Sequence, residues 1–236
     1  MGWGAMGEIL KNEVGSLCPA MKAADMVGDK WVILILREMF LGSSRYNEFQ
    51  RALPRISPTI LSKRLKQLES DGLVIKKGGK SGEYRLTACG RELWPVIEGL
   101  ATWGLRWARR RLSEEDIDSG TFMWDFHRTL NTGALPDGET VICVSLSDRT
   151  VNRTWWMAAC DGTVELCVDD PGKDVDLYVS GTLETIAGVW MGDTPVLSAV
   201  KDERIVMNGA PHLARTVDQW FPKSMFAEVR PERLMA

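Results

Sequence analysis

One stretch, from Pro54 to Leu73, constrains the fold of this chain more than any other. Ser57 followed by Pro58 predicts the start of a helix, because a hydroxyl can cap the first turn and the missing N–H of proline costs nothing there. Asp71-Gly72 predicts the end of that helix. Apolar residues recur between these points at helical spacing. They predict one buried stripe, made of Ile60, Leu61, Leu65 and Leu68.

The opposite face of this predicted helix carries hydrogen-bond donors and no carboxylate before Glu69. Two short strands, 73–77 and 83–86, follow the helix and enclose a glycine-rich turn. A donor-rich helix followed by a basic hairpin is typical of a winged helix-turn-helix domain that binds DNA. From Arg45 to Arg85 there are ten Lys and Arg against four Asp and Glu, which favours this interpretation over an ordinary solvated face.

Within the predicted helix, the residues nearest its start are expected to contact base edges, and the outlying basic residues are expected to contact phosphates. The expected base contacts are Thr59, Ser62 and Lys63. Ser57, which caps the helix, is also expected to contact DNA. The expected phosphate contacts are Arg45, Lys66, Lys77 and Lys80. Arg64 lies between two predicted buried leucines, and for it DNA contact and a structural ion pair are equally open.

The charge of the chain is divided unevenly along its length. Residues 1–112 hold 19 Lys and Arg against 11 Asp and Glu, a net of +8, whereas residues 113–236 hold 10 against 21, a net of −11. A basic half joined to an acidic half indicates a nucleic-acid-binding domain with a separate domain that does not bind DNA. We expect an N-terminal arm at 1–17, a DNA-binding domain at 18–112 and a second domain at 113–236.

Three further helices are predicted in the basic half before the hairpin, at 19–27, 32–40 and 46–53. The second is apolar nearly all round and predicts the buried centre of the domain. After the hairpin, Thr87 predicts the cap of one long helix from Cys89 to about Leu112, with a heptad-like seam. The predicted seam consists of Leu93, Ile97, Leu100, Gly104 and Trp107. This seam could pack on its own domain, but its length favours the interface of a homodimer on a pseudo-palindromic DNA site.

Several short motifs in this half stand in a fixed order and spacing, namely Cys18-Pro19, Gly28-Asp29-Lys30-Trp31, Arg45-Tyr46-Asn47-Glu48-Phe49, Ile56-Ser57, Leu61-Ser62-Lys63-Arg64-Leu65, Asp71-Gly72-Leu73-Val74, Tyr84-Arg85-Leu86-Thr87 and Gly90-Arg91. Together they resemble the HxlR-type winged-helix regulators over roughly residues 18–107. This resemblance implies a homodimeric bacterial transcription regulator. In some members of the family, the cysteine at the start of the first helix senses oxidants or electrophiles, and the resemblance implies this role for Cys18. The helix dipole at this position would favour the reactive thiolate. An inert thiol is the alternative for Cys18.

The acidic half alternates between strand and helix patterns, which predicts an α+β fold. The predicted helices are 122–130, 183–191, 197–200 and 213–220, and the predicted strands are 141–145, 154–159, 163–168, 176–180 and 204–207. Three segments, 176–181, 190–192 and 205–209, resemble the sterol-carrier-protein type of lipid-binding domain over about residues 120–222. That resemblance implies an apolar tunnel between sheet and helices.

Four tryptophans of the acidic half have three possible roles. They can fill a small core, line an apolar ligand pocket or anchor an interface. Alternation along a strand makes one of two neighbouring tryptophans face outward. The four residues are Trp155, Trp156, Trp190 and Trp220.

The sequence gives little support for catalysis, metal binding or membrane insertion. The two histidines, His127 and His212, lie far from any cysteine pair, and the five scattered cysteines form neither a disulfide framework nor a metal motif. No Ser/His/Asp constellation has recognisable context, and no apolar run approaches 18 residues. We expect a cytoplasmic protein that is no enzyme, with no cofactor and no metal.

The sequence therefore predicts a dimeric, sequence-specific DNA-binding transcription regulator with a sterol-carrier-like C-terminal domain. Its partners would be double-stranded DNA, a second copy of the chain and an apolar small molecule, and either that ligand or thiol modification would modulate it. The main alternative is a lipid or small-molecule carrier whose N-terminal half is an interaction module. An enzyme hidden in the C-terminal half is a weaker alternative.

Overall fold

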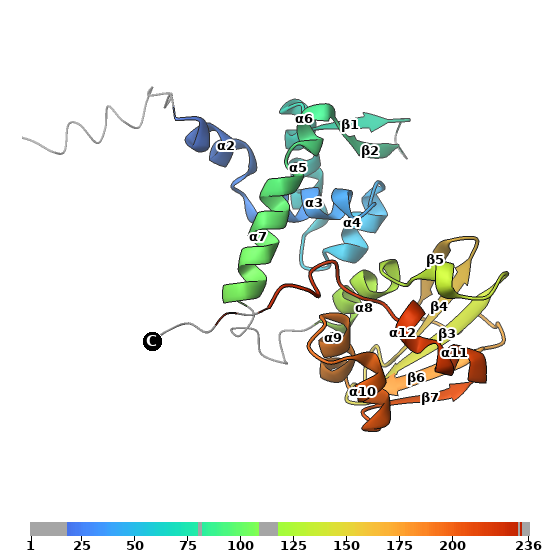
Figure 1. The fold of residues 1–236 in the computed structure, drawn as a ribbon. Helices are drawn as coiled ribbons and strands as arrows, with labels where there is room; N and C mark the ends of the chain where they lie inside the picture. Colours follow the sequence, from blue (N-terminus) through green and yellow to red (C-terminus); the bar gives the residue numbers. More distant parts are fainter. Residues whose placement is uncertain (1–17, 80–81, 109–117, 231, 233–236) are drawn as a thin grey trace, which may run out of the picture. The chain divides into compact units, whose positions relative to one another are not determined.

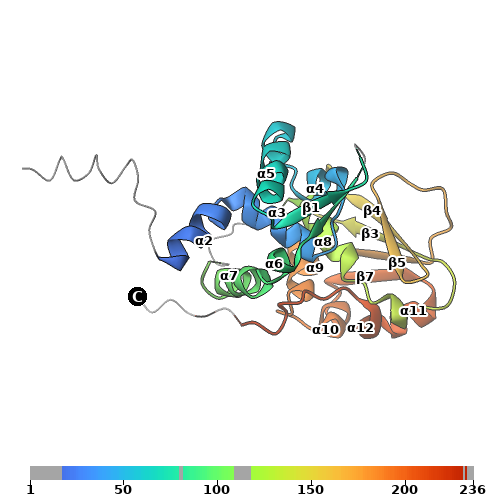
Figure 2. The ribbon, with the colours of Figure 1, turned by 90° about the horizontal axis from the view of Figure 1, so that it is seen from above.

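The computed structural model describes residues 18–79, 82–108, 118–230 and 232. The predicted arm at 1–17, Lys80 and the predicted domain boundary at residue 112 lie outside the described residues. Contacts within the chain divide it into two units, Met1–Ile97 and Glu98–Ala236. Figures 1 and 2 show the elements of each unit in two views.

The first unit is a winged helix-turn-helix (Figure 1). The pair α4 and α5 is followed by an antiparallel wing, in which Val74 pairs with Leu86 and Lys77 with Glu83. The four helices predicted before the hairpin and the hairpin itself are confirmed, with bounds that differ by at most two residues. The elements are α2 (Pro19–Val27), α3 (Lys30–Phe40), α4 (Tyr46–Ala52), α5 (Pro58–Ser70), β1 (Val74–Lys77), β2 (Glu83–Leu86), α6 (Ala88–Arg91) and α7 (Trp94–Trp107), the last of which crosses into the second unit.

The core of the first unit surrounds α3, as the sequence predicts. From α3, Val32, Ile35 and Leu36 are fully buried. From α5, three of the four residues of the predicted stripe are buried, namely Leu61, Leu65 and Leu68. The prediction for Ile60 was wrong, because its side chain is 38% exposed. Each helical residue is rotated by about 100° from the one before it, so a stripe centred on residues 61, 65 and 68 leaves residue 60 at its edge.

The prediction of one long helix after the wing was also wrong. Thr87 does cap a helix, since its Oγ1 accepts a hydrogen bond from the Gly90 N–H at 3.0 Å, but that helix is the single turn α6. The chain then turns at 92–93 before α7 begins. Pro95 is the physical reason, because proline has no N–H for the preceding turn and its ring clashes with the carbonyl there. Leu112 lies outside the described residues.

The second unit is a five-stranded mixed sheet with helices, whose strands are labelled in Figure 1. Its strand order is β5-β4-β3-β6-β7, and only the β3–β6 pairing is parallel. The α+β prediction for this half is confirmed. The elements are α8 (Ser119–Arg128), η3 (Thr132–Ala134), β3 (Thr140–Leu146), β4 (Thr154–Cys160), β5 (Thr163–Cys167), β6 (Leu177–Gly181), α9 (Leu183–Trp190), α10 (Val196–Lys201), β7 (Ile205–Gly209), α11 (Pro211–Arg215) and α12 (Val217–Trp220).

Local signals explain two turns of this unit. The β4–β5 hairpin turns at Asp161 and Gly162 as predicted, and both have positive φ, at 50° and 77°. Such angles favour Asp and Gly in tight hairpins. The predicted helix at 213–220 was wrong, since α11 and α12 are separate. The Thr216 hydroxyl between them donates to the carbonyl oxygen of His212 at 3.0 Å, a side-chain bond of the kind that competes with a continuous helix.

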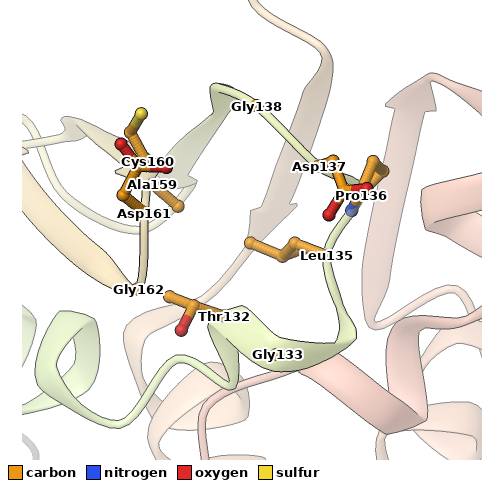
Figure 3. A pocket seen from close by; sticks show the side chains of 10 residues that line it. All are labelled: Thr132, Gly133, Leu135, Pro136, Asp137, Gly138, Ala159, Cys160, Asp161 and Gly162. Carbon is orange, nitrogen blue, oxygen red and sulfur yellow. The ribbon is translucent and has the colours of Figure 1, made fainter.

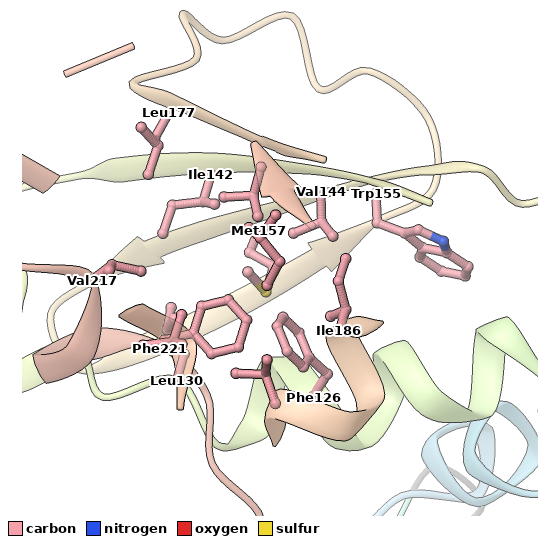
Figure 4. Close-up of a cluster of buried hydrophobic side chains, with 14 of the residues drawn as sticks. Phe126, Leu130, Ile142, Val144, Trp155, Met157, Leu177, Ile186, Val217 and Phe221 are labelled. Atoms are coloured by element: carbon pink, nitrogen blue, oxygen red, sulfur yellow. The ribbon is translucent and has the colours of Figure 1, made fainter. Parts of the chain in front are cut away.

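The core of the second unit lies between one face of the sheet and the helices (Figure 4). The sheet contributes Ile142 and Met157, which are at most 1% exposed. The helices contribute Phe126, Ile186 and Trp220, which are also at most 1% exposed. Packed apolar side chains therefore occupy the space where the resemblance to sterol carriers places a tunnel.

Candidate nucleic-acid interface

The helix α5 presents two chemically different faces. Its start is fixed by Ser57, whose Oγ accepts a hydrogen bond from the Ile60 N–H at 3.3 Å. While the leucines of the stripe face the core, the side chains of Thr59, Lys63 and Lys66 are exposed. The donors expected to contact DNA thus lie on the face turned away from the core.

Two serines, one before this helix and one within it, have contacts inside the domain. Ser57 is the cap described above, and Ser62 is half-buried. The Ser62 hydroxyl donates to Oη of Tyr46 at 3.3 Å, and the Tyr46 hydroxyl donates to the carbonyl oxygen of Pro58 at 2.9 Å. These bonds join α4 to the start of α5. Of the three residues expected to read bases, Thr59 and Lys63 are the ones left exposed.

Arg64 forms an ion pair within the domain, which is one of the two roles left open for it. Its Nη2 lies 2.6 Å from Oδ2 of Asp29, and its Nη1 donates to Oε1 of Gln67 at 2.8 Å. The other carboxylate oxygen of Asp29 accepts from the N–H of Trp31 at 2.9 Å and so caps α3. One carboxylate therefore connects the beginning of α3, just after α2, to the recognition helix α5.

The wing and the start of α4 bring further basic side chains together. Lys77 is exposed at the end of β1, and Arg45, also exposed, precedes α4. The Tyr84 N–H donates to the carbonyl oxygen of Ser44 at 2.7 Å, which ties β2 to the segment before α4. Glu83 lies between the two elements, with Oε1 at 3.3 Å from Nη2 of Arg45.

Arg85 belongs to the same basic cluster and was missed in the sequence. Its Nη2 lies 3.0 Å from Oε2 of Glu83. Because side chains two apart in a strand share a face, the order Glu83-Tyr84-Arg85 could have revealed the pair. Hydrogen bonds from Arg85 and then from Arg45 hold the pKa of Glu83 below its usual value. The carboxylate therefore stays charged between the two guanidinium groups.

Cys18, the candidate sensor, is exposed at the first position before α2. Pro19 follows as the first helical residue, as predicted, and none of the nine residues of α2 is buried. The helix ends at Val27, and its C-cap residue, Gly28, immediately precedes Asp29, the N-cap of α3. A thiol at the start of α2 is thus one short helix away from the ion pair that reaches α5.

The four tryptophans of the acidic half do not gather around one cavity. Trp155 and Trp220 are buried in the core, where their Nε1–H groups donate to the carbonyl oxygens of Asn152 and Leu213, each at 2.9 Å. Trp190 packs against the same core and donates to Oγ1 of Thr129 at 2.8 Å. Trp156 faces the other side of the sheet, beside Cys143 and Cys167. This placement favours the core interpretation for three of the four.

A small open pocket lies at the edge of the sheet instead (Figure 3). It has a volume of about 160 Å³ and is formed by the segment before β3 and by the β4–β5 turn. Its lining includes Asp137 and Cys160.

Two thiols of this unit have raised pKa values. The carboxylate of Asp161 raises the pKa of the Cys160 thiol, and burial raises the pKa of Cys143 to about 11. Both thiols are therefore protonated and poorly nucleophilic near neutral pH.

Two other kinds of site were sought in the part of the chain that the structure describes. No group of three His, Cys, Asp or Glu side chains there is arranged to hold a metal ion. None of its helices is both long enough and apolar enough to cross a membrane.

A helix-turn-helix pair with a donor-bearing second helix and a basic wing defines a winged-helix DNA-binding protein. The sequence profile of the HxlR-like helix-turn-helix family matches residues 26–112. The uncharacterised HTH-type transcriptional regulator sll1512 of Synechocystis is 36% identical over 112 residues, which are 46% of this chain and 83% of that protein. The uncharacterised HTH-type transcriptional regulator YvaP of Bacillus subtilis is 38% identical, over 39% of this chain and 89% of that protein.

On these sequence matches, the chain belongs to the HxlR-like helix-turn-helix family and is a transcription regulator of that type. Among solved structures, the redox regulator HypR in its oxidised form is 35% identical, covers 37% of this chain and 94% of that one, and has a TM-score of 0.35. The family profile ends at residue 112, so the acidic C-terminal unit is described by its fold alone, as α+β.

Proposed function

We propose that this regulator binds a specific duplex DNA site as a homodimer, with α5 in the major groove and the wing on the adjacent backbone. The exposed side chains of Thr59 and Lys63 would contact base edges. Lys66, Lys77 and Arg45 would contact phosphates and set the salt dependence of binding. Lys80, which lies between β1 and β2 in the sequence, belongs to the same proposed set.

One observation carries this proposal: the cap at Ser57 and the buried leucines fix α5 so that its exposed face holds donors and two lysines. A helix held in this way can enter a groove without unfolding any part of the core. The wing that follows adds Lys77 and the Glu83-linked arginines. A basic face made of a helix and a hairpin matches the width and charge of duplex DNA.

The test begins with selection of binding sequences from a random duplex pool by the full-length protein. We expect enrichment of one sequence, which would then be titrated at several salt concentrations against a scrambled duplex of equal length. The variant Lys63→Glu/Lys66→Glu should lose detectable binding to the selected duplex. The matched control, Lys201→Glu/Lys223→Glu, makes the same charge change at exposed lysines of the acidic unit and should bind as wild type does.

Two results would contradict the proposal. One is a pool in which no sequence is enriched, and the other is a Lys63→Glu/Lys66→Glu variant that keeps wild-type affinity. Apolar ligand uptake by a protein that enriches no DNA would favour the alternative, a carrier whose N-terminal half is an interaction module.

The helix α7 supports the homodimer in this proposal, although through a different face from the predicted seam. Ile97 of that seam is buried, whereas Val96, Leu100 and Trp103 are 59%, 48% and 59% exposed, and of these three Leu100 alone belongs to the seam. They lie four and three residues apart and so share one helical face, which a second copy of α7 would cover. We expect Leu100→Lys/Trp103→Lys to sediment as a monomer in analytical ultracentrifugation and to lose affinity for the selected duplex. A dimer that survived both changes would exclude α7 as the interface.

Thiol modification of Cys18 is the proposed route of modulation. A bulky or charged adduct there would displace the start of α2, and the displacement would reach α5 through Asp29 and Arg64. We expect an alkylating agent to weaken DNA binding by the wild type and to leave binding by Cys18→Ser unchanged. An equal loss in both proteins would place the reactive thiol elsewhere.

For the C-terminal unit, we propose the sterol-carrier-like identity and an apolar ligand or a role in assembly, with no catalysis. Support comes from its α+β order, in which the three resembling segments fall on β6, the end of α9 and β7. Tight packing of the described core favours assembly over a preformed tunnel. Saturable uptake of a fluorescent fatty acid by the full-length protein would instead favour the apolar ligand.

A further inference from the structure

A carboxylate lies between two arginines of the basic surface proposed to bind DNA. Attraction between this surface and the phosphates does not explain its presence. Glu83 is the first residue of β2 and lies opposite Lys77 in the wing. Its two oxygens contact Arg45 and Arg85 on either side, at 3.3 Å and 3.0 Å. A negative charge at this position repels phosphate, so its role must lie in what it does to the two arginines.

The two arginines are well placed for a second partner. Their side chains are 61% and 59% exposed, and the described contacts of each use a single nitrogen. A guanidinium group has five N–H donors in a rigid fork, so each retains donors directed to solvent. The backbone around them is also fixed, because Glu48 caps α4 at the Arg45 N–H, at 2.9 Å, and Tyr84 bonds Ser44.

We propose that Glu83 is a positioning residue, which holds Arg45 and Arg85 in single conformations so that both contact the DNA backbone where the wing joins the helix-turn-helix. This inference rests on the proposed DNA-binding function and adds Arg85 to its phosphate contacts. Ordering a long side chain only when DNA arrives weakens binding, and a carboxylate that orders two arginines beforehand removes that loss. The benefit exceeds the repulsion because the charge of Glu83 is already balanced by two guanidinium groups.

Two substitutions separate positioning from simple repulsion. Glu83→Gln removes the negative charge, so repulsion alone predicts tighter binding to every duplex. Positioning predicts the opposite for the selected duplex, a loss of at least about tenfold, because the cost of ordering two long side chains prevents the freed arginines from holding their two phosphates. Glu83→Asp keeps the charge but is one methylene shorter and cannot reach both arginines, so it should weaken binding to a similar extent.

The salt dependence gives a readout that a purely structural defect would not change. Loss of two phosphate contacts should reduce the slope of log K against log salt by about 1.8, since each contact contributes about 0.9. Glu92→Gln, at an exposed glutamate after α6, is the charge-matched control and should keep the wild-type slope. Thermal melting of each variant checks that the fold is intact.

Tighter binding of the selected duplex by Glu83→Gln, or wild-type affinity and slope in both Glu83 variants, would overturn the inference while leaving the proposed function in place. A wild-type protein that enriched no sequence would refute the proposed function and this inference with it. Weaker binding with a reduced slope in both variants, and an unchanged control, would support it.

Discussion

The pair of Asp29 and Arg64 joins two helices through one carboxylate, and substitutions can separate its two tasks. Asp29 caps α3 through the N–H of Trp31 and binds Arg64 of α5 at 2.6 Å. Asp29→Ala removes the cap and the ion pair together. Asp29→Asn keeps a good cap, because asparagine caps helices about as well as aspartate does, but it removes the charge. The cost of Asp29→Asn relative to the wild type isolates the ion pair, and the difference between the two variants isolates the cap.

The expected magnitudes follow from the geometry. Loss of the cap costs about 1 kcal/mol. The ion pair is short and its side chains are only 24% and 33% exposed, so it should contribute about 1 kcal/mol, the upper end of the range for exposed pairs. Asp29→Asn should therefore cost about 1 kcal/mol and Asp29→Ala about 2 kcal/mol. In a double-mutant cycle, Asp29→Asn with Arg64→Met should show a coupling energy of about 1 kcal/mol.

Native-state hydrogen exchange of peptides from α3 and α5 is the suitable assay, because it reports on these helices alone, whereas a melting curve reports on both units of the chain together. Asp25→Asn, at an exposed position of α2, is the charge-matched control. If Asp29→Asn leaves the protection of α5 unchanged, or if the two substitutions are additive, the ion pair does not connect the helices. The proposed route from Cys18 to α5 would then be wrong as well.

Three further outcomes follow from the packing. Burial lowers the pKa of His127 to about 4, whereas the pKa of histidine in the unfolded chain is about 6.5. The unfolded state therefore binds the proton more readily, and up to about 3 kcal/mol of stability should be lost as the pH falls from 6.5 to 4. His127→Gln should flatten this pH dependence in urea titrations, whereas His212→Gln, at an exposed site, should not. Leu65→Ala should cost about 2–5 kcal/mol in the first unit and abolish DNA binding, measured by exchange and titration, since the side chain is 1% exposed. Gly192→Ala should lower the melting temperature of the second unit in calorimetry, because φ is +79° and a Cβ would lie 2.5 Å from the Ala227 carbonyl oxygen; an unchanged melting temperature would mean that the loop relaxes freely.

The sequence by itself determined the elements that depend on local signals. Ser57-Pro58 and Asp71-Gly72 bound the recognition helix because caps and helix stops act within a few residues. The pair Asp161-Gly162 likewise made the β4–β5 hairpin predictable, because these residue types accept the positive φ angles that a tight hairpin needs. The uneven charge and the spaced motifs of the first unit also sufficed to indicate its class, because they require no knowledge of distant contacts.

Only the tertiary structure decided which side chains meet across the chain. Arg64 meets Asp29 across 35 positions and Glu83 meets Arg45 across 38, and no periodicity in the sequence relates such residues. The same holds for the tryptophans, since an aromatic residue packs equally well in a core or around a ligand until its neighbours are known. Local patterns fix helices and turns, whereas ion pairs and core positions depend on how the elements pack.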